Sequence, residues 1–340
     1  MTNTTNALLE KSTLDILQQM TDCAQKTLNY FSSHLNKDGS FGDHASDLTC
    51  YYKAPMMFIN AQREDLAKRV INNIKVNYMQ KDGDLLWNAT TKSIKPEYIE
   101  FWAYMNSWIE RAAYKLDIKE LSEPVYNYIN QYQIGQTNKK ELDTGITDVL
   151  TAAYQGLINL ERDQLTKAFE AANYLCDCYD KQPDLLARFY LRFNQNNDPI
   201  TDFSQDQAIF CCVSKAQPNQ LYFMLAYPSA FLSLLYLETK DEKYLKYAKA
   251  YTDYALSCHT NVLSSRFSHK LAWALSILYK IIKNPLYLFA IKEISSYFVQ
   301  IQAENGLWFQ DEVIETSYDQ SAELACWFFE ISDSLRQLIK

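Results

Sequence analysis

Residues 227–258 read YPSAFLSLLYLETKDEKYLKYAKAYTDYALSC, and residues 268–302 read SHKLAWALSILYKIIKNPLYLFAIKEISSYFVQIQ. Each stretch has an apolar segment, a short polar break, and a second segment with one apolar face. In the first stretch Phe231, Leu234 and Leu235 precede the break, and the same spacing recurs in the second. Apolar residues three and four apart form one face of an α-helix. The two stretches therefore predict the same helical hairpin twice, and a repeat of this length governs how the whole chain is interpreted.

The same periodicity predicts twelve helices of two kinds. Six are apolar on nearly all sides and follow a long loop, near 48–60, 97–116, 147–160, 228–238, 268–283 and 319–339. Six have one apolar face, near 12–34, 63–79, 119–132, 163–179, 240–257 and 286–302. A helix that is apolar all round belongs inside a protein, and a helix with one wet face belongs outside. We therefore predict an all-α fold, an (α/α)6 barrel or toroid of six inner and six outer helices. It forms a single domain over 1–340, with a long insertion near 181–226.

Composition restricts the classes of partner. Apolar residues make up 48% of the 340 residues and charged residues 22%, which is enough apolar material for a sizeable core. The net charge of −8 argues against nucleic acids and anionic membranes, which bind basic surfaces. No apolar run approaches the roughly 20 residues of a membrane span. The sequence does not determine the oligomeric state.

Location and cofactors follow from what the sequence lacks. The first residues, MTNTTNALLEKS, do not have the basic and apolar parts of a secretion signal, so we expect a cytoplasmic protein with reduced thiols. The eight cysteines include no CxxC pair, and no HxxH pair occurs. We therefore predict no metal site. No Gly-rich phosphate loop is present, so no nucleotide cofactor is expected.

The long loops point to the place of a site. Each joins an outer helix to the next inner helix, so all of them lie at one end of the predicted barrel. They hold six of the seven glycines, and all four histidines lie in them or at adjoining helix ends. Loops on a rigid scaffold are where binding residues concentrate, and the inner-helix N-termini favour negative charge there. This end is therefore the predicted mouth, which takes a small-molecule substrate.

Several segments carry resemblances to known families. The stretch 290–309, AIKEISSYFVQIQAENGLWF, resembles the QW motif of the squalene-cyclase and terpenoid-cyclase family through Gln302, Gly306 and Trp308. That motif staples a helix end to the following loop. The acidic motifs of that family, DxDD and DDxxD, do not occur in this chain.

Two further resemblances lie near the predicted mouth. The stretch 306–328, GLWFQDEVIETSYDQSAELACWF, is similar to the closing segment of unsaturated-uronyl hydrolases. Residues 217–223, QPNQLYF, look like a segment of linalool dehydratase–isomerase, a toroid that adds or removes water on a small terpene without a cofactor. This likeness implies that 217–223 line the mouth. The chain as a whole resembles the α/α-toroid superfamily, which includes six-hairpin glycosidases, sugar epimerases and terpenoid cyclases.

Acids and imidazoles near the inner-helix starts are the catalytic candidates. Asp43, His44 and Asp47 lead into the first inner helix, where a carboxylate beside an imidazole forms an acid–base pair. The alternative is that Asp47 caps the helix and His44 is solvated. Asp148 lies in the first turn of the third inner helix, where capping is again the alternative. His269 begins the fifth, and a helix N-terminus lowers the pKa of a nearby imidazole.

The candidates for substrate binding are polar or aromatic residues of the same loops and helix ends. Trp308 is also explained as the structural staple, and any one of the 25 tyrosines is more often a core residue. The candidates are Trp108, Asp143, Gln217, Asn219, Tyr222, Lys270, Trp308, Asp311 and Tyr318.

The sequence favours one function and leaves alternatives open. We predict a cofactor-independent lyase, isomerase or cyclase that acts by acid–base chemistry on a small, largely apolar metabolite, terpenoid- or polyketide-like. The alternatives are a carbohydrate-active enzyme, either an unsaturated uronyl hydrolase or a sugar epimerase, and a binding scaffold. A mouth of Tyr, Phe and Leu with one Asp and one His favours the first function. Two carboxylates with several Arg or Lys favour the sugar enzyme, and a filled barrel favours the scaffold.

Overall fold

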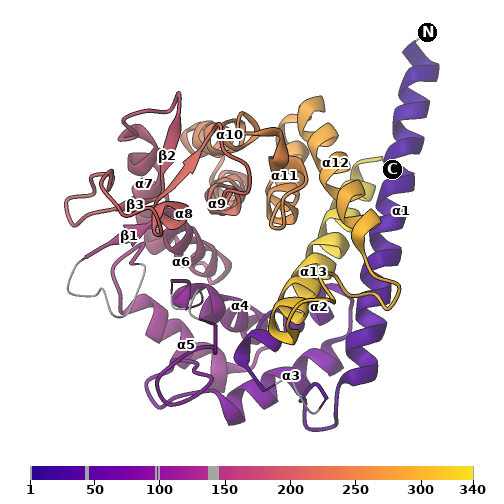
Figure 1. Ribbon diagram of the computed structural model, residues 1–340, viewed down its shortest axis with the longest axis vertical. Helices are drawn as coiled ribbons and strands as arrows, with labels where there is room; N and C mark the ends of the chain where they lie inside the picture. The colour runs from indigo at the N-terminus through magenta and orange to yellow at the C-terminus, as the bar shows by residue number, and fades with distance from the viewer. Residues whose placement is uncertain (1, 43–45, 96–97, 99, 137–144, 340) are drawn as a thin grey trace.

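In a computed structural model, the helices form a closed double ring (Figure 1). The structure describes residues 2–42, 46–95, 98, 100–136 and 145–339. The inner helices are α2 (Ala54–Asn60), α4 (Trp102–Lys115), α6 (Val149–Glu161), α9 (Phe223–Thr239), α11 (His269–Ile282) and α13 (Ile314–Ile339). The outer helices are α1 (Thr2–His34), α3 (Glu64–Asn77), α5 (Lys119–Asn130), α7 (Leu165–Asp180), α10 (Glu242–Leu256) and α12 (Pro285–Ile301). Each inner helix contacts the next, and α13 contacts α2 to close the ring. The predicted all-α (α/α)6 toroid is confirmed.

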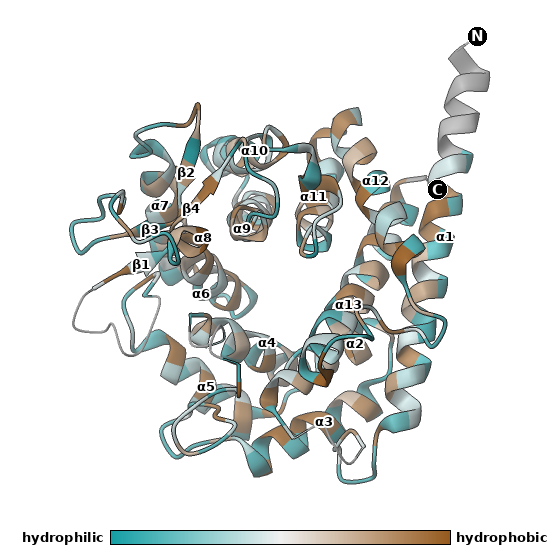
Figure 2. Ribbon diagram, in the orientation of Figure 1, coloured by the Kyte–Doolittle hydropathy of each residue, from teal (hydrophilic) through white to brown (hydrophobic). Residues whose placement is uncertain are grey.

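Burial separates the two rings as the sequence pattern predicts. In α9 every residue from Phe223 to Ser233 is buried. In α10 buried and exposed residues alternate with helical spacing, and the exposed face includes Glu242 and Lys246. Figure 2 shows hydrophilic residues on the outer helices and loops, except that α12 is largely hydrophobic and exposes Leu286 and Phe289. Inner helices lose contact with water because helices surround them on all sides.

The short turns from inner to outer helices share one backbone device. Five of them contain a non-glycine residue in the left-handed region, with φ between 52° and 59°. Such a residue ends one helix within a few residues and starts the next, since it reverses the chain direction sharply. The five residues are Gln62, Asp117, Asp163, Lys240 and Lys283.

The QW-like segment closes the outer ring. Trp308 Nε1 donates to Phe298 O at 2.8 Å, and Gln302 Nε2 donates to Gly306 O at 2.9 Å. A Cβ on Gly306 would lie 2.7 Å from the carbonyl carbon of Lys26 in α1. The loop after α12 therefore lies directly against α1, and only a residue without a side chain fits at this contact.

The insertion near 181–226 contains short strands whose pairing partners the sequence did not indicate. Strand β1 (Thr147–Asp148) pairs antiparallel with β3 (Arg192–Phe193), and β2 (Arg188–Tyr190) pairs with β4 (Cys212–Ser214). Strands of two or three residues are too short to show the alternation of a β-strand. Residues 147 and 148, expected to begin an inner helix, form strand β1 instead, and α6 begins at residue 149, two residues later than expected.

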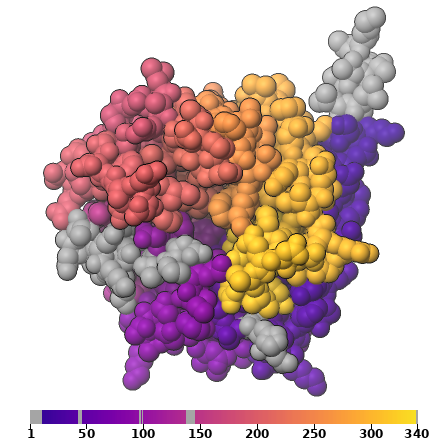
Figure 3. Space-filling model, in the orientation of Figure 1, coloured from indigo at the N-terminus to yellow at the C-terminus, as the bar shows by residue number. Residues whose placement is uncertain are grey.

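Four more inner helices begin at other residues than expected. A short 3-10 helix, η1 (Leu48–Cys50), precedes α2, and α4 begins at residue 102 rather than near 97. In contrast, α9 begins at 223 and α13 at 314, each five residues before the expected start. Two other short helices, α8 (Ala208–Cys211) and η4 (Thr260–Leu263), lie in the long connections. Figure 3 shows the insertion (pink to red) and the segment leading into α13 (yellow) on one face of the molecule. Within the described residues, no helix combines the length and apolar character needed to cross a membrane.

Candidate functional site

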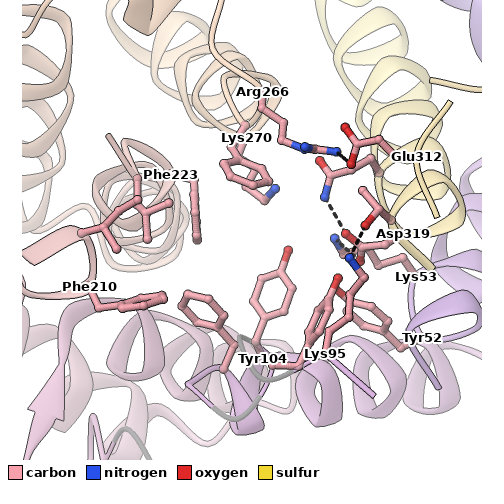
Figure 4. Close-up of a pocket in the computed structure, with 17 residues that line it drawn as sticks. Tyr52, Lys53, Lys95, Tyr104, Phe210, Phe223, Arg266, Lys270, Glu312 and Asp319 are labelled. Carbon is pink, nitrogen blue, oxygen red and sulfur yellow. Dashed lines mark hydrogen bonds and ion pairs between the residues drawn. The ribbon is translucent and has the colours of Figure 1, made fainter. Parts of the chain in front are cut away.

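A cavity of about 270 Å³ lies at the loop end of the barrel (Figure 4). Residues at or just before the N-terminal ends of five inner helices, α2, α4, α9, α11 and α13, line it together with α8. Its wall combines apolar rings with charged groups. The rings belong to Tyr52, Tyr98, Phe101, Tyr104, Phe210, Phe223 and Phe267. The cations are Lys53, Lys95, Arg266 and Lys270, and the carboxylates are Glu312 and Asp319.

Glu323, on the third turn of α13, contacts the other charged groups at the floor of the cavity. Its Oε2 forms a short ion pair with Lys53 and a second ion pair with Lys270 Nζ at 2.9 Å. His269 Nε2 lies 3.5 Å from the same oxygen. Burial disfavours the charged carboxylate, but the Lys270 and Lys53 ammonium groups outweigh burial and hold the pKa of Glu323 well below its usual range. Glu323 is therefore a permanent anion.

The second oxygen of Glu323 is held by neutral donors from three helices. Its Oε1 accepts from Tyr104 OH at 3.0 Å, Tyr227 OH at 3.2 Å and Trp327 Nε1 at 3.3 Å. With three donors on Oε1 and two cations on Oε2, both oxygens of the carboxylate are engaged by protein groups. Glu323 thus positions its neighbours and does not exchange protons.

Lys270 is the cavity residue whose pKa the site brings close to neutral pH. It is the second residue of α11 and is almost completely buried. Its Nζ lies 5.0 Å from the ring centre of Phe223 and 4.8 Å from that of Phe267. Burial lowers the pKa of Lys270 to about 8, with Glu323 opposing this shift and the nearby Lys53 ammonium adding to it. A fraction of this amine is neutral near neutral pH.

The wall opposite holds an acid and a second lysine. Lys53 Nζ contacts Asp319 Oδ1 at 2.7 Å, and Asp319 is 3% exposed. Gln320 Nε2 donates to the other oxygen of Asp319. Asp319 lines the cavity and is held in place by these two partners. It is therefore the carboxylate best placed to take up or release a proton at a bound molecule.

A second ion pair lies at the side of the cavity. Arg266 contacts Glu312 Oε2 at 2.6 Å, and its guanidinium lies 4.4 Å from the ring centre of Phe309. Lys95 Nζ donates to Thr316 Oγ1 at 2.7 Å. Both pairs join segments far apart in the chain across the mouth.

Of the five catalytic candidates, the structure places His269 at this floor. His269 is buried, and its Nε2 lies 3.3 Å from Lys270 Nζ. Burial, and then the Lys270 charge, lower the pKa of His269 to about 4, so the imidazole is neutral. Asp43 and His44 lie outside the described residues.

The remaining two catalytic candidates are capping residues outside this cavity. Asp47 caps η1 through the Thr49 N–H and also accepts from the Ile94 N–H at 2.7 Å. Asp148 caps α6 through the Thr151 N–H at 2.6 Å, and burial raises its pKa to about 6. Both carboxylates are held by backbone N–H groups, which is the alternative that the sequence left open.

Of the binding candidates, Lys270 lines the cavity, and Asp143 lies outside the described residues. Asn219 and Asp311 are exposed and do not line the cavity. Tyr222 turns away from it, and its OH donates to Gln217 O at 3.1 Å. The predicted lining by 217–223 is therefore restricted to Leu221 and Phe223, on either side of Tyr222.

Three aromatic candidates are core residues. Trp108 is buried and donates to Tyr154 OH at 3.0 Å. Trp308 forms the staple described above. Tyr318 is buried among aromatic rings that include Phe31 and Phe41. None of the three lines the cavity.

Sequence reasoning missed Lys53 and Glu323, the two charges that organise the floor. A signal was present, because each is a lone charge in an apolar segment, YYKAPMMF and SAELACWFF. A buried charge is costly unless it is paired. A single Lys or Glu in a helix that is apolar on all sides therefore predicts a partner of opposite charge across the barrel.

Comparisons with known proteins identify the fold. No protein-family model matches the chain, and no curated protein sequence matches it. Solved structures that resemble it include a family 76 α-mannanase from Bacteroides thetaiotaomicron, at 12% identity and a TM-score of 0.62 over 94% of this chain and 97% of that one. A D-mannose isomerase gives 12% and 0.62 over 92% and 97%. A type II terpene cyclase from Scytonema gives 11% and 0.58 over 94% and 99%. The chain thus shares the toroid architecture of glycosidases, isomerases and cyclases.

Proposed function

We propose that this protein is an enzyme, a lyase, isomerase or cyclase, that moves protons on a small molecule with a largely apolar body. The observation that carries the proposal is the floor of the cavity. There a buried lysine of lowered pKa and a held aspartate face a space walled by seven aromatic rings. Aromatic walls exclude water and bind an apolar body, and a few polar groups then fix its orientation.

The proton-transfer roles fall to two cavity residues. Lys270, partly neutral near pH 8, is the base or acid on one side, because catalysis is most efficient when the pKa lies near the working pH. Asp319 is the partner on the other side. Glu323 and Lys53 hold these two groups in place and are positioning residues.

The cations of the cavity suggest that the molecule carries an anionic or strongly polar group. Four cations and two carboxylates line the wall, so positive charge prevails there. The terpene cyclase of similar fold is described in complex with geranylgeranyl dihydroxybenzoate, a molecule with an apolar tail and a carboxylate. A terpenoid or aromatic acid or carbonyl compound is the class we propose for this chain.

A carbohydrate-active enzyme is the second candidate. It is favoured by Asp319 and Glu312, two carboxylates in one cavity with several cations, and by the α-mannanase and mannose isomerase of similar fold. A pair of carboxylates flanking a glycosidic bond is the usual apparatus of glycoside hydrolysis. Glu312 is held in an ion pair with Arg266, however, so it is not free to contact a glycosidic oxygen without breaking that pair.

Thermal-shift binding separates the two candidates. We would screen geranyl and aryl carboxylates and ketones against mannose, mannobiose and unsaturated uronides. A ligand at 100 times its Kd adds about 2.7 kcal/mol. The entropy of unfolding is about 0.7 kcal/mol/K for 340 residues, so Tm rises by about 4 °C.

Variants tie the response to this cavity. Lys270→Met and Asp319→Asn are expected to abolish the Tm shift, and the exposed Lys283→Met, at the opposite turn, is the matched control. A shift with sugars alone favours the second candidate. A shift that persists in both cavity variants places the binding site elsewhere and refutes the proposal.

A further inference from the structure

The nitrogen of Lys270 has one bonding direction left over at the cavity wall. Its Nζ contacts Glu323 Oε2 at 2.9 Å and His269 Nε2 at 3.3 Å. Among the described residues, these are the ion pair and the hydrogen bond that this nitrogen forms. Figure 4 shows the nitrogen directed into the cavity. A neutral amine that donates its two hydrogens to Glu323 and His269 keeps its lone pair for the remaining direction.

The surroundings of this nitrogen make the neutral amine easier to reach than it is for a lysine in water. The rings of Phe223 and Phe267 lie on it, and both exclude water. The Lys53 ammonium shares the same carboxylate oxygen, Glu323 Oε2, so two cations compete for one anion. Desolvation and a neighbouring cation are the two conditions that activate a lysine as a nucleophile.

We propose that Lys270 forms an imine with the carbonyl carbon of an aldehyde or ketone bound in this cavity. The inference rests on the proposed function and names the substrate class, a carbonyl compound with an apolar or aromatic body. The nitrogen lone pair forms the N–C bond while the carbonyl π pair moves to oxygen, which takes up a proton. The carbinolamine then loses that oxygen as water. The balance is R–NH2 + O=CR2 → R–N=CR2 + H2O, with no change of oxidation state.

The imine connects this step to proton transfer. Once protonated, it withdraws electrons from the neighbouring carbon and acidifies its C–H bond. Asp319, held by Lys53 and Gln320 at the cavity wall, is the base for that proton, and the C–H electron pair moves toward the iminium nitrogen to give an enamine. Return of a proton to the same or another carbon gives an exchange or an isomerisation.

Reductive trapping tests the imine on the native protein. The probe is phenylacetone with sodium cyanoborohydride, which reduces an imine to a stable secondary amine. The product is then identified by intact mass and peptide mapping. We expect one probe per chain, on the peptide that contains Lys270. Lys270→Arg should abolish this label. Lys283→Arg, the control, should keep the label on Lys270; Lys283 is an exposed lysine whose pKa is also lowered by partial burial.

The outcomes distinguish the failure of the imine proposal from the failure of the proposed function. Label on Lys53, on Lys95 or spread over surface lysines overturns the imine, and peptide mapping of the wild type shows this even where Lys270→Arg does not fold. No label, together with a ligand-dependent Tm shift that Lys270→Met abolishes, overturns the imine and leaves the proposed function standing. Label on Lys270 without any Tm shift from the carbonyl and carboxylate panel supports the imine and counts against that function.

Discussion

Replacing Glu323 by Gln tests the charge network directly. The change keeps an acceptor for Tyr104, Tyr227 and Trp327 but puts an amide NH2 against the Lys53 and Lys270 ammonium groups. Removing one partner of a buried ion pair leaves an uncompensated buried charge and costs about 3–5 kcal/mol. With an unfolding entropy of about 0.7 kcal/mol/K for this chain, Tm should fall by about 4–7 °C.

The cost should depend on pH with a definite sign. The pKa of Lys270 in the folded protein is about 8, below its ordinary value, and losing Glu323 lowers it further. At pH 6 Lys270 is charged in the wild type, so losing the Glu323 carboxylate destabilises the variant by the full amount. Above pH 8 it is neutral in both proteins. The difference in Tm between variant and wild type should therefore be largest near pH 6 and narrow toward pH 9. Part of the difference should remain at pH 9, because Lys53 also loses its ion pair with Glu323.

Thermal unfolding followed by circular dichroism at both pH values measures this effect. The matched control is Glu120→Gln, which removes an exposed ion pair with Lys75 and should shift Tm by about 1 °C or less. Lys270→Met combined with Glu323→Gln should recover part of the loss, because one uncompensated charge is gone. A Glu323→Gln shift no larger than the control, and constant from pH 6 to 9, would refute the reasoning about the floor.

Three other outcomes are expected. Gly156→Ala should lower stability by about 1–3 kcal/mol in urea unfolding, because its Cβ would lie 2.4 Å from the buried Phe231 ring; an unchanged midpoint contradicts this close packing. Asp148, whose folded pKa is raised to about 6, destabilises the wild type by about 2 kcal/mol as pH rises from 4 to 7, so Asp148→Asn should gain stability relative to wild type over that range. A difference that is flat with pH would show that this carboxyl titrates normally. The eight cysteines are free and buried, so a thiol reagent should label fewer than one per native chain in minutes and all eight in denaturant; rapid native labelling would show that a thiol is accessible.

Much of the architecture was predictable because it depends on short-range periodicity. Segments apolar on all sides, such as 228–238, became inner helices, and segments with one apolar face became outer helices. Burial on all sides is a property of composition alone, so neither long-range contacts nor exact helix ends were needed. The short strands of the insertion were not predictable, since two or three residues carry no period.

The site was only partly predictable. The sequence indicated the loop end of the barrel, His269 and Lys270, because histidines and long loops gather at inner-helix starts. It also offered Asp47 and Asp148, which an N-cap position explains equally well. The acids differ only in their surroundings. Asp47 and Asp148 face backbone N–H groups, and Asp319 faces Lys53 beside the cavity.

The sequence by itself determined a ring of paired helices and the end at which its long loops gather. Only the tertiary structure decided which charges meet, because Lys53 and Glu323 are 270 residues apart and become neighbours only when α13 contacts α2. The closure of the ring puts one carboxylate between two lysines. The low polarity of the barrel interior then sets the pKa of Lys270, which no local pattern encodes.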